Sequence, residues 1–128
     1  MPTSVRLDAW RRRRRIERAF QGRESLTPET FYETYFLKKG FPLSVVAGVR
    51  DVLETQLSAD LSRLVDTDDF SKNLSFFWSF DSMADVEVVC ALEERFHIEI
   101  SDDEALNAHT VEDIVSLVHK KTGVQGQP

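Results

Sequence analysis

Apolar side chains at helical spacing are the feature that most constrains the fold of this chain. They recur close to the 3.6-residue period of an α-helix between residues 46 and 57 and again between residues 83 and 96. No segment shows the sustained alternation of apolar and polar residues that indicates paired β-strands. The sequence therefore predicts an all-α domain with these residues in its core: Val46, Val49, Val52, Leu53, Leu57, Met83, Val86, Val89, Cys90, Leu92, Phe96 and, in a later segment, Ile114.

Capping signals place the ends of the helices. Thr27 as N-cap and Pro28 at the first helical position predict a helix that precedes the first apolar stretch. Thr110 and Asp113 have the spacing of a capping box that opens the last helix, and we expect Gly123 to end that helix. The other predicted helices run from about residue 43 to residue 58, over residues 83–96 and over residues 102–106.

Residues 59–81 form the least regular stretch. They have no sustained period, are rich in Asp, Ser and Thr, and contain four aromatic residues close together: Phe76, Phe77, Trp78 and Phe80. We predict a long loop that buried aromatic side chains hold in place.

Charge divides the chain into two unequal parts. Residues 1–25 hold eight arginines against three acids, a net charge of +5, whereas residues 26–128 hold eight basic residues against nineteen acids, a net charge of −11. Like-charge repulsion along Arg11 to Arg15 opposes a packed core there. We therefore predict a basic, flexible arm or a marginal helix over residues 1–25, an additional N-terminal helix over 26–44, a helical bundle over 45–123 and a disordered tail over 124–128.

Several classes of function find no support in the residues. Cys90 is the only cysteine, which excludes an intramolecular disulfide, and it has no plausible base at helical spacing. The histidines are scattered, so we expect no catalytic residue and no metal site. No apolar run is long enough to span a bilayer. We expect a cytoplasmic monomer. The Arg11–Arg15 run is either simply solvated or binds nucleic acid, an anionic membrane surface or an acidic partner.

One continuous stretch of residues points to a known family. The run DSMADVEVVCALEERF at 81–96, followed in register by IEISDDEA at 98–105 and by Thr110-Val111, closely resembles the acyl carrier protein family. Residues 49–57 and 70–74 are similar to its first helix and long loop, so that the resemblance covers residues 49–123. It implies a four-helix acyl-carrier-type bundle with a long loop between the first and second bundle helices, to which the helix over 26–44 is added.

The resemblance also implies the chemistry. Ser82 corresponds to the serine to which 4'-phosphopantetheine is attached, which would make the chain a phosphoprotein and a carrier, not an enzyme. Acyl groups would be held on the arm as thioesters for fatty-acid, polyketide or specialised lipid synthesis. The implied partners are a phosphopantetheinyl transferase and acyl synthases or acyltransferases with basic docking patches. The implied partner-binding residues are Asp81, Met83, Glu87, Glu93 and Glu94, and the implied acyl-chain pocket is lined by Val49, Leu53, Val86, Val89, Leu92 and Ile114.

The residues leave an alternative open. Ser82 and Asp85 are spaced as a capping box, so that Ser82 would stabilise the helix start without any modification. An unmodified protein-interaction domain that docks through the acidic helix and the aromatic loop is the second hypothesis. The chain also departs from the family where it has Met83 in place of leucine and Ser79 in place of glycine.

Overall fold

Helices make up all the regular structure of the described part of the chain. The structure, a computed structural model, describes residues 2–80 and 83–125. In chain order the elements are α1 (Pro2–Phe20), α2 (Pro28–Tyr35), the short 3-10 helix η1 (Leu37–Lys39), α3 (Leu43–Leu57), α4 (Phe76–Phe80), α5 (Ala84–Phe96), α6 (Asp102–Asn107) and α7 (Val111–Gln125). The predicted all-α fold is confirmed, with a four-helix carrier-type bundle formed by α3, α5, α6 and α7.

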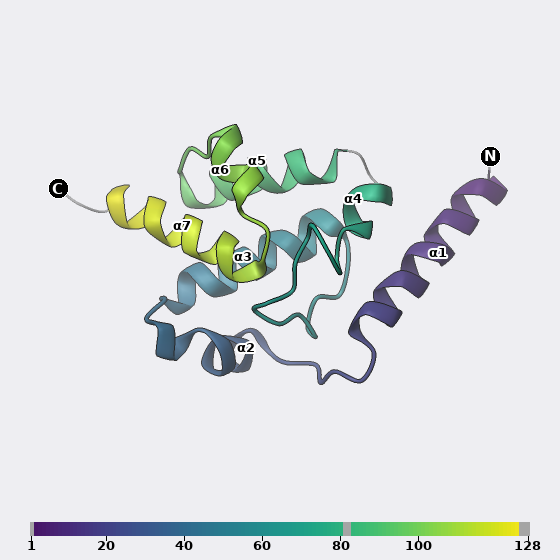
Figure 1. Ribbon diagram of the computed structural model, residues 1–128, viewed down its shortest axis with the longest axis horizontal. Helices are drawn as coiled ribbons and strands as arrows, with labels where there is room; N and C mark the ends of the chain where they lie inside the picture. The colour runs from purple at the N-terminus through teal and green to yellow at the C-terminus, as the bar shows by residue number, and fades with distance from the viewer. Residues whose placement is uncertain (1, 81–82, 126–128) are drawn as a thin grey trace.

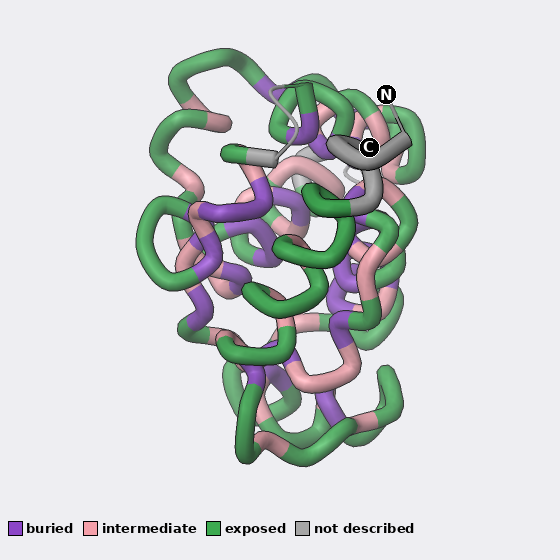
Figure 2. The backbone as a smooth tube through the Cα atoms, turned by 90° about the vertical axis from the view of Figure 1, so that its right-hand side faces the viewer, coloured by how far each residue is buried: buried purple, intermediate pink, exposed green. Residues whose placement is uncertain are grey.

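Helix α3 is the centre of the bundle. It packs against α5, α7 and α2, and Figure 1 shows it running between them. Eight of its residues are buried. At Gly48 a Cβ atom would lie 2.6 Å from the ring of Phe96, so only glycine lets α5 approach this closely. Figure 2 shows the buried positions gathered on the inner sides of the helices, with exposed positions outside.

The long loop after α3 is held by buried side chains and by the backbone. Leu61, Leu64, Phe70 and Leu74 are at most 2% exposed. Phe70 donates its backbone N–H to the carbonyl of His109 at 2.9 Å, beside an isolated bridge at the start of α7. The loop is thus buried and pinned, as predicted, but the structure adds the helix α4, which sequence reasoning had taken as part of the loop.

Helix α4 forms because two of its aromatic side chains lie in the core. Phe76 and Phe77 are 3% and 1% exposed and stack with ring centroids 4.5 Å apart. Phe70 lies against both Phe77 and Trp78. Burial of these rings orders a single helical turn where no periodic pattern was visible.

Residues 2–20 form helix α1, so that of the two alternatives predicted for this segment the structure has the helix. Helix α1 ends at Phe20, whose side chain is completely buried. The guanidinium of Arg12 donates to the carbonyl of Leu57, and Glu17 pairs with Arg63 at 2.7 Å. Repulsion along the arginine run is therefore offset by contacts that a composition argument does not include.

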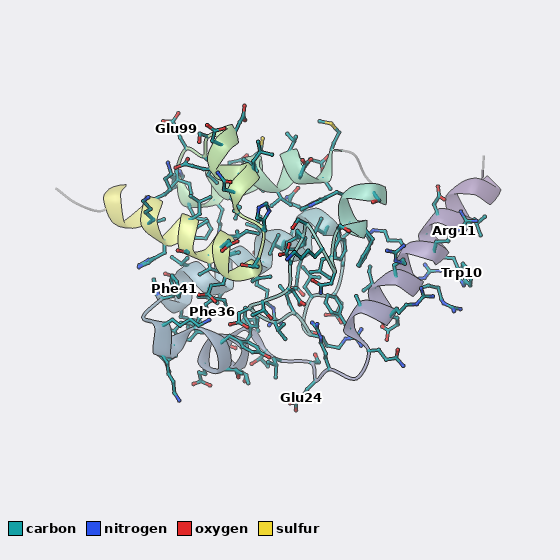
Figure 3. The ribbon with its side chains drawn as sticks, viewed as in Figure 1. Trp10, Arg11, Glu24, Phe36, Phe41 and Glu99 are labelled. Atoms are coloured by element: carbon teal, nitrogen blue, oxygen red, sulfur yellow. The ribbon has the colours of Figure 1, made fainter. Side chains whose placement is uncertain are left out.

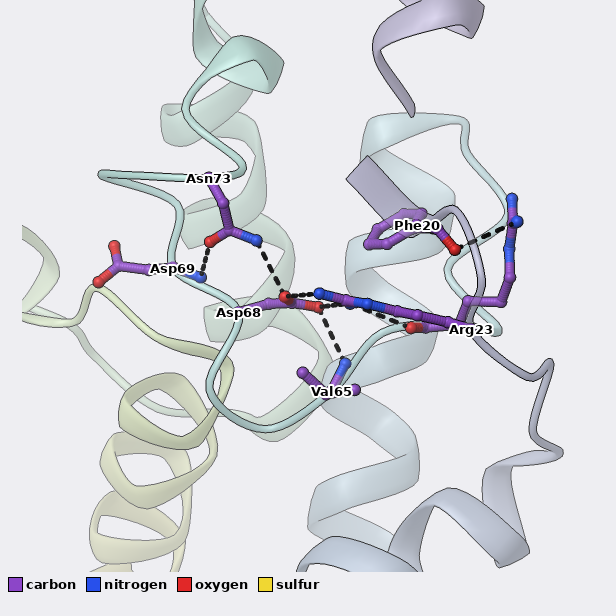
Figure 4. A network of polar contacts seen from close by, with 7 residues as sticks. Phe20, Arg23, Val65, Asp68, Asp69 and Asn73 are labelled. Carbon is purple, nitrogen blue, oxygen red and sulfur yellow. Dashed lines mark hydrogen bonds and ion pairs between the residues drawn. The ribbon is translucent and has the colours of Figure 1, made fainter. Parts of the chain in front are cut away.

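A buried ion pair fixes the segment after α1 to the long loop (Figure 4). The guanidinium of Arg23 donates to both carboxylate oxygens of Asp68, at 2.8 and 3.0 Å, and Asp68 is only 2% exposed. The same carboxylate accepts from the backbone N–H of Val65 at 2.9 Å and from Nδ2 of Asn73 at 3.0 Å. This carboxylate therefore joins two parts of the chain 45 residues apart.

The capping predictions are confirmed at two helices and corrected at one end. Thr27 caps α2 with Pro28 at the first helical position. Thr110 and Asp113 exchange hydrogen bonds at 3.0 Å at the start of α7. Helix α7 continues through Gly123 to Gln125, because a glycine in the right-handed helical region weakens a helix without ending it.

Candidate functional site

The candidate site is the corner between α4 and α5. Asp81 and Ser82, the predicted partner-contact and attachment residues, lie outside the described residues, as does the proposed cap by Ser82. Met83 occupies the N-cap position of α5 without a side-chain capping hydrogen bond to the helix backbone. Backbone N–H groups and the helix dipole favour negative charge at such an end. The start of α5 therefore favours a negatively charged group attached to a residue just before it.

The buried side of α5 differs from the predicted one. Ala84, Val88 and Leu92, spaced by four residues, are 2–4% exposed. Met83 and Val86 are 53% and 48% exposed, so their assignment to the core is wrong. Val86, also predicted to line the acyl-chain pocket, lies at the surface in this structure. The prediction failed because apolar residues lie on most sides of this helix. Residues 83, 86 and 89 fit a helical period as well as residues 84, 88 and 92 do, so spacing alone does not show which series is buried.

The opposite side of α5 carries an exposed stripe of mixed chemistry. Met83, Glu87, Cys90 and Glu94, spaced by four, three and four residues, are all exposed; we call these four residues the outer stripe. Three of the predicted partner-binding residues belong to it. Cys90, expected among the apolar core positions, belongs to it as well.

Glu93 has a different position from its neighbour Glu94. It is half-buried, and one of its carboxylate oxygens accepts a hydrogen bond from the backbone N–H of Ile100 at 2.8 Å. Its carboxylate thus fixes the loop that leads from α5 to α6. Glu93 is therefore a predicted partner contact whose carboxylate is already used within the fold.

Most of the predicted acyl-chain residues meet in one place. Val49 and Leu53 of α3, Leu92 of α5 and Ile114 of α7 are 0–8% exposed and belong to the hydrophobic core. Val89 is half-buried and packs against this core. These side chains are thus grouped between helices, where an apolar chain would have to separate them in order to enter.

Two rings of the aromatic loop are buried and do not form the exposed docking surface that the second hypothesis requires. Phe76 and Phe77 are core residues, and Trp78 is half-buried against Phe70. Arg12 and Arg15 of α1 cover the rings of Phe77 and Phe76, with each guanidinium carbon 5.4 Å from the ring centroid. Sequence reasoning missed this cover, since nothing in the sequence pairs residues so far apart.

Within the described residues, no group of three or more histidine, cysteine or acidic side chains is arranged to hold a metal ion. No helix of the described segments is long and apolar enough to cross a membrane.

Comparison with known proteins agrees with this architecture. The family model described as "Phosphopantetheine attachment site" matches residues 47–118. An acyl carrier protein of Thermosynechococcus vestitus is 34% identical over 77 residues, 60% of this chain and 90% of the relative. Acyl carrier proteins of Solidesulfovibrio magneticus and Helicobacter hepaticus are 32% and 40% identical, over 63% and 55% of this chain and 99% and 87% of their own lengths.

The helical bundle and the matched region define a carrier that bears a covalent 4'-phosphopantetheine group and is not itself a catalyst. The chain belongs to the acyl carrier protein family.

Proposed function

We propose that Ser82 carries the phosphopantetheine group and that the chain presents acyl thioesters to enzymes of fatty-acid, polyketide or specialised lipid synthesis. The observation that carries this proposal is the position of Ser82. It lies inside the matched region, directly before the N-cap residue of α5, in an Asp-Ser-apolar triplet. We further propose that residues 45–123 are the carrier unit and that residues 26–44 are a packing element added to it, since α2 packs against α3.

The chain itself has a limited chemical task. In the attachment step the hydroxyl oxygen of Ser82 would form a bond to phosphorus, the adenosine bisphosphate part of coenzyme A would leave, and the hydroxyl proton would pass to a base of the transferase. The bound group then supplies a thiol that holds the acyl chain as a thioester. The carrier contributes the attachment serine and a surface that partners bind. We expect this to take place in the cytoplasm, with the carrier as a monomer.

Incubation with a phosphopantetheinyl transferase and coenzyme A tests the attachment. We expect the intact mass to rise by one phosphopantetheinyl group in the natural chain and in Ser79→Ala, and to stay unchanged in Ser82→Ala. Ser79 is an exposed serine only three residues away, so it controls for a general effect on the corner. A gain by Ser82→Ala, or no gain by the natural chain with several transferases, would contradict the proposal.

The outer stripe of α5 is the proposed partner surface. Attraction between its acids and a basic patch would raise the association rate more than it would tighten binding. We therefore expect the double variant Glu87→Lys/Glu94→Lys to slow modification by about 10-fold or more at low salt. Glu24→Lys/Glu33→Lys makes the same change of charge at exposed positions outside α5 and should leave the rate nearly unchanged. Equal slowing by both variants would show that only net charge matters.

A further inference from the structure

Helix α1 carries a basic face that points mostly away from the bundle, with Arg15 at its edge because that guanidinium lies over the ring of Phe76. Arg11, Arg14, Arg15 and Arg18 line a shallow hollow of about 210 Å³ together with Trp10. All five side chains are exposed, and Figure 3 shows Trp10 and Arg11 on the far side of α1 from the bundle.

The opposite side of α1 holds the helix in place. Ile16 and Ala19 pack against the core, and Phe20 lies within it. Arg12, on the same side, reaches the end of α3 and the ring of Phe77. Helix α1 is therefore anchored through one face, and its basic face is left for an external partner.

The charge on the basic face is not neutralised within the fold. Among the residues that the structure describes, none of Arg11, Arg14, Arg15 and Arg18 is ion-paired. The acid nearest in sequence to Arg18, Glu17, pairs with Arg63 instead. Clustered guanidinium groups attract anionic groups, phosphates above all.

Two exposed apolar side chains at the N-terminal end of this face favour a lipid surface over nucleic acid as the partner. Leu7 is 43% exposed and Trp10 is 49% exposed, and both lie within one helical turn of Arg11. A helix with arginines beside tryptophan and leucine is suited to the interface of an anionic bilayer, where the phosphates meet the cations and the apolar tips enter the boundary region. Nucleic acid would use the arginines but would leave Leu7 without a role.

We infer that the basic face of α1, formed by Trp10, Arg11, Arg14, Arg15 and Arg18, docks the protein onto an anionic lipid surface. The remainder of the chain, residues 26–128, carries a net charge of −11 and is repelled by such a surface. Attraction and repulsion together orient the molecule with α1 toward the lipid and the acidic stripe of α5 free for partners. The inference does not depend on modification of Ser82.

Co-sedimentation of the full-length, unmodified chain with lipid vesicles tests this inference. We expect binding to vesicles of phosphatidylcholine mixed with phosphatidylglycerol, little binding to pure phosphatidylcholine, and a decrease as salt is added. The variant Arg11→Gln/Arg14→Gln/Arg18→Gln should bind on the order of 100-fold more weakly, about 5-fold for each arginine removed.

The matched control removes the same charge elsewhere. Lys38→Gln/Lys72→Gln/Lys120→Gln changes three exposed lysines outside α1 and should retain binding within a few-fold. Circular dichroism of both variants confirms that each is folded.

Three results would overturn the inference: no binding to the anionic vesicles at low salt, equal loss in both triple variants, or an oligonucleotide that displaces the chain from the vesicles at matched phosphate concentration. None of these results changes the outcome of the mass measurement on Ser82, so the two proposals fail separately.

Discussion

At the scale of residues, two buried charged side chains connect the N-terminal segments to the bundle. Asp68 forms an ion pair with Arg23. Arg50 of α3 is 4% exposed and donates to the carbonyl of Leu26 at 2.7 Å, with its guanidinium over the ring of Phe31. Burial lowers the pKa of the Arg50 guanidinium, because the charged form has lost water. The placement of the N-terminal segments against the bundle therefore depends on specific polar contacts as well as on apolar packing.

Asp68→Asn should destabilise the fold strongly. The substitution removes the charge that faces Arg23, and losing one partner of a buried pair costs about 3 kcal/mol. Asp51→Asn is the matched control, because Asp51 and its partner Arg95 are 61% and 47% exposed and such a pair is worth less than about 1 kcal/mol. Urea unfolding measures both, and equal losses would contradict the importance of burial.

The ion pair of Glu104 between α6 and α7 should make the stability of the fold depend on pH. Its carboxylate pairs with Lys121 at 2.8 Å and accepts from the backbone N–H of Ser101, which lowers its pKa to about 2 from an ordinary 4.5. Because this pKa is lower in the folded state than in the unfolded state, the charged carboxylate contributes to the free energy of unfolding. The contribution is complete above pH 4.5 and is lost as the pH falls toward 2.

Thermal unfolding of Glu104→Gln against the natural chain tests this. We expect the variant to be less stable near neutral pH and the difference to shrink as the pH falls through this window. A difference that is constant over the same range would show that the carboxylate charge is unimportant.

At the scale of elements, α5 presents one buried and one exposed side. Val88→Ala should cost about 2 kcal/mol, because it leaves space in the core. Val86→Ala removes the same atoms from a side chain that is 48% exposed and should cost less than about 0.5 kcal/mol. Urea unfolding of this pair on one helix decides which side faces α3, and the reverse order would contradict the observed orientation.

The same helix shows how far sequence reasoning reaches. The existence of most helices and the caps at Thr27 and Thr110 could be predicted, because they depend on local spacing. The rotation of α5 could not be predicted, since Val86 and Val88 are equally apolar. Only the packing of α5 against α3, where Phe96 lies close to Gly48, distinguishes them. Helix α4 and the anchoring of α1 were missed for a related reason: both are ordered by residues distant in sequence.

At the scale of the whole molecule, the basic surface and the acidic surface lie on different helices. The basic face lies on α1, and the acidic outer stripe lies on α5, with α4 between the two helices (Figure 1). The corner with Ser82 follows α4 directly in the chain. This order allows one surface to hold the protein at a site in the cell while another meets partner enzymes.

The central claim, that Ser82 bears the prosthetic group, is tested most directly on protein isolated from its native cells. Intact-mass measurement followed by fragmentation of the peptide that contains residues 81–83 locates any modification. We predict a phosphopantetheinyl group, with or without an acyl chain, on Ser82 alone. A peptide that carries an unmodified Ser82 in all of the protein, or the group on another residue, would contradict the account.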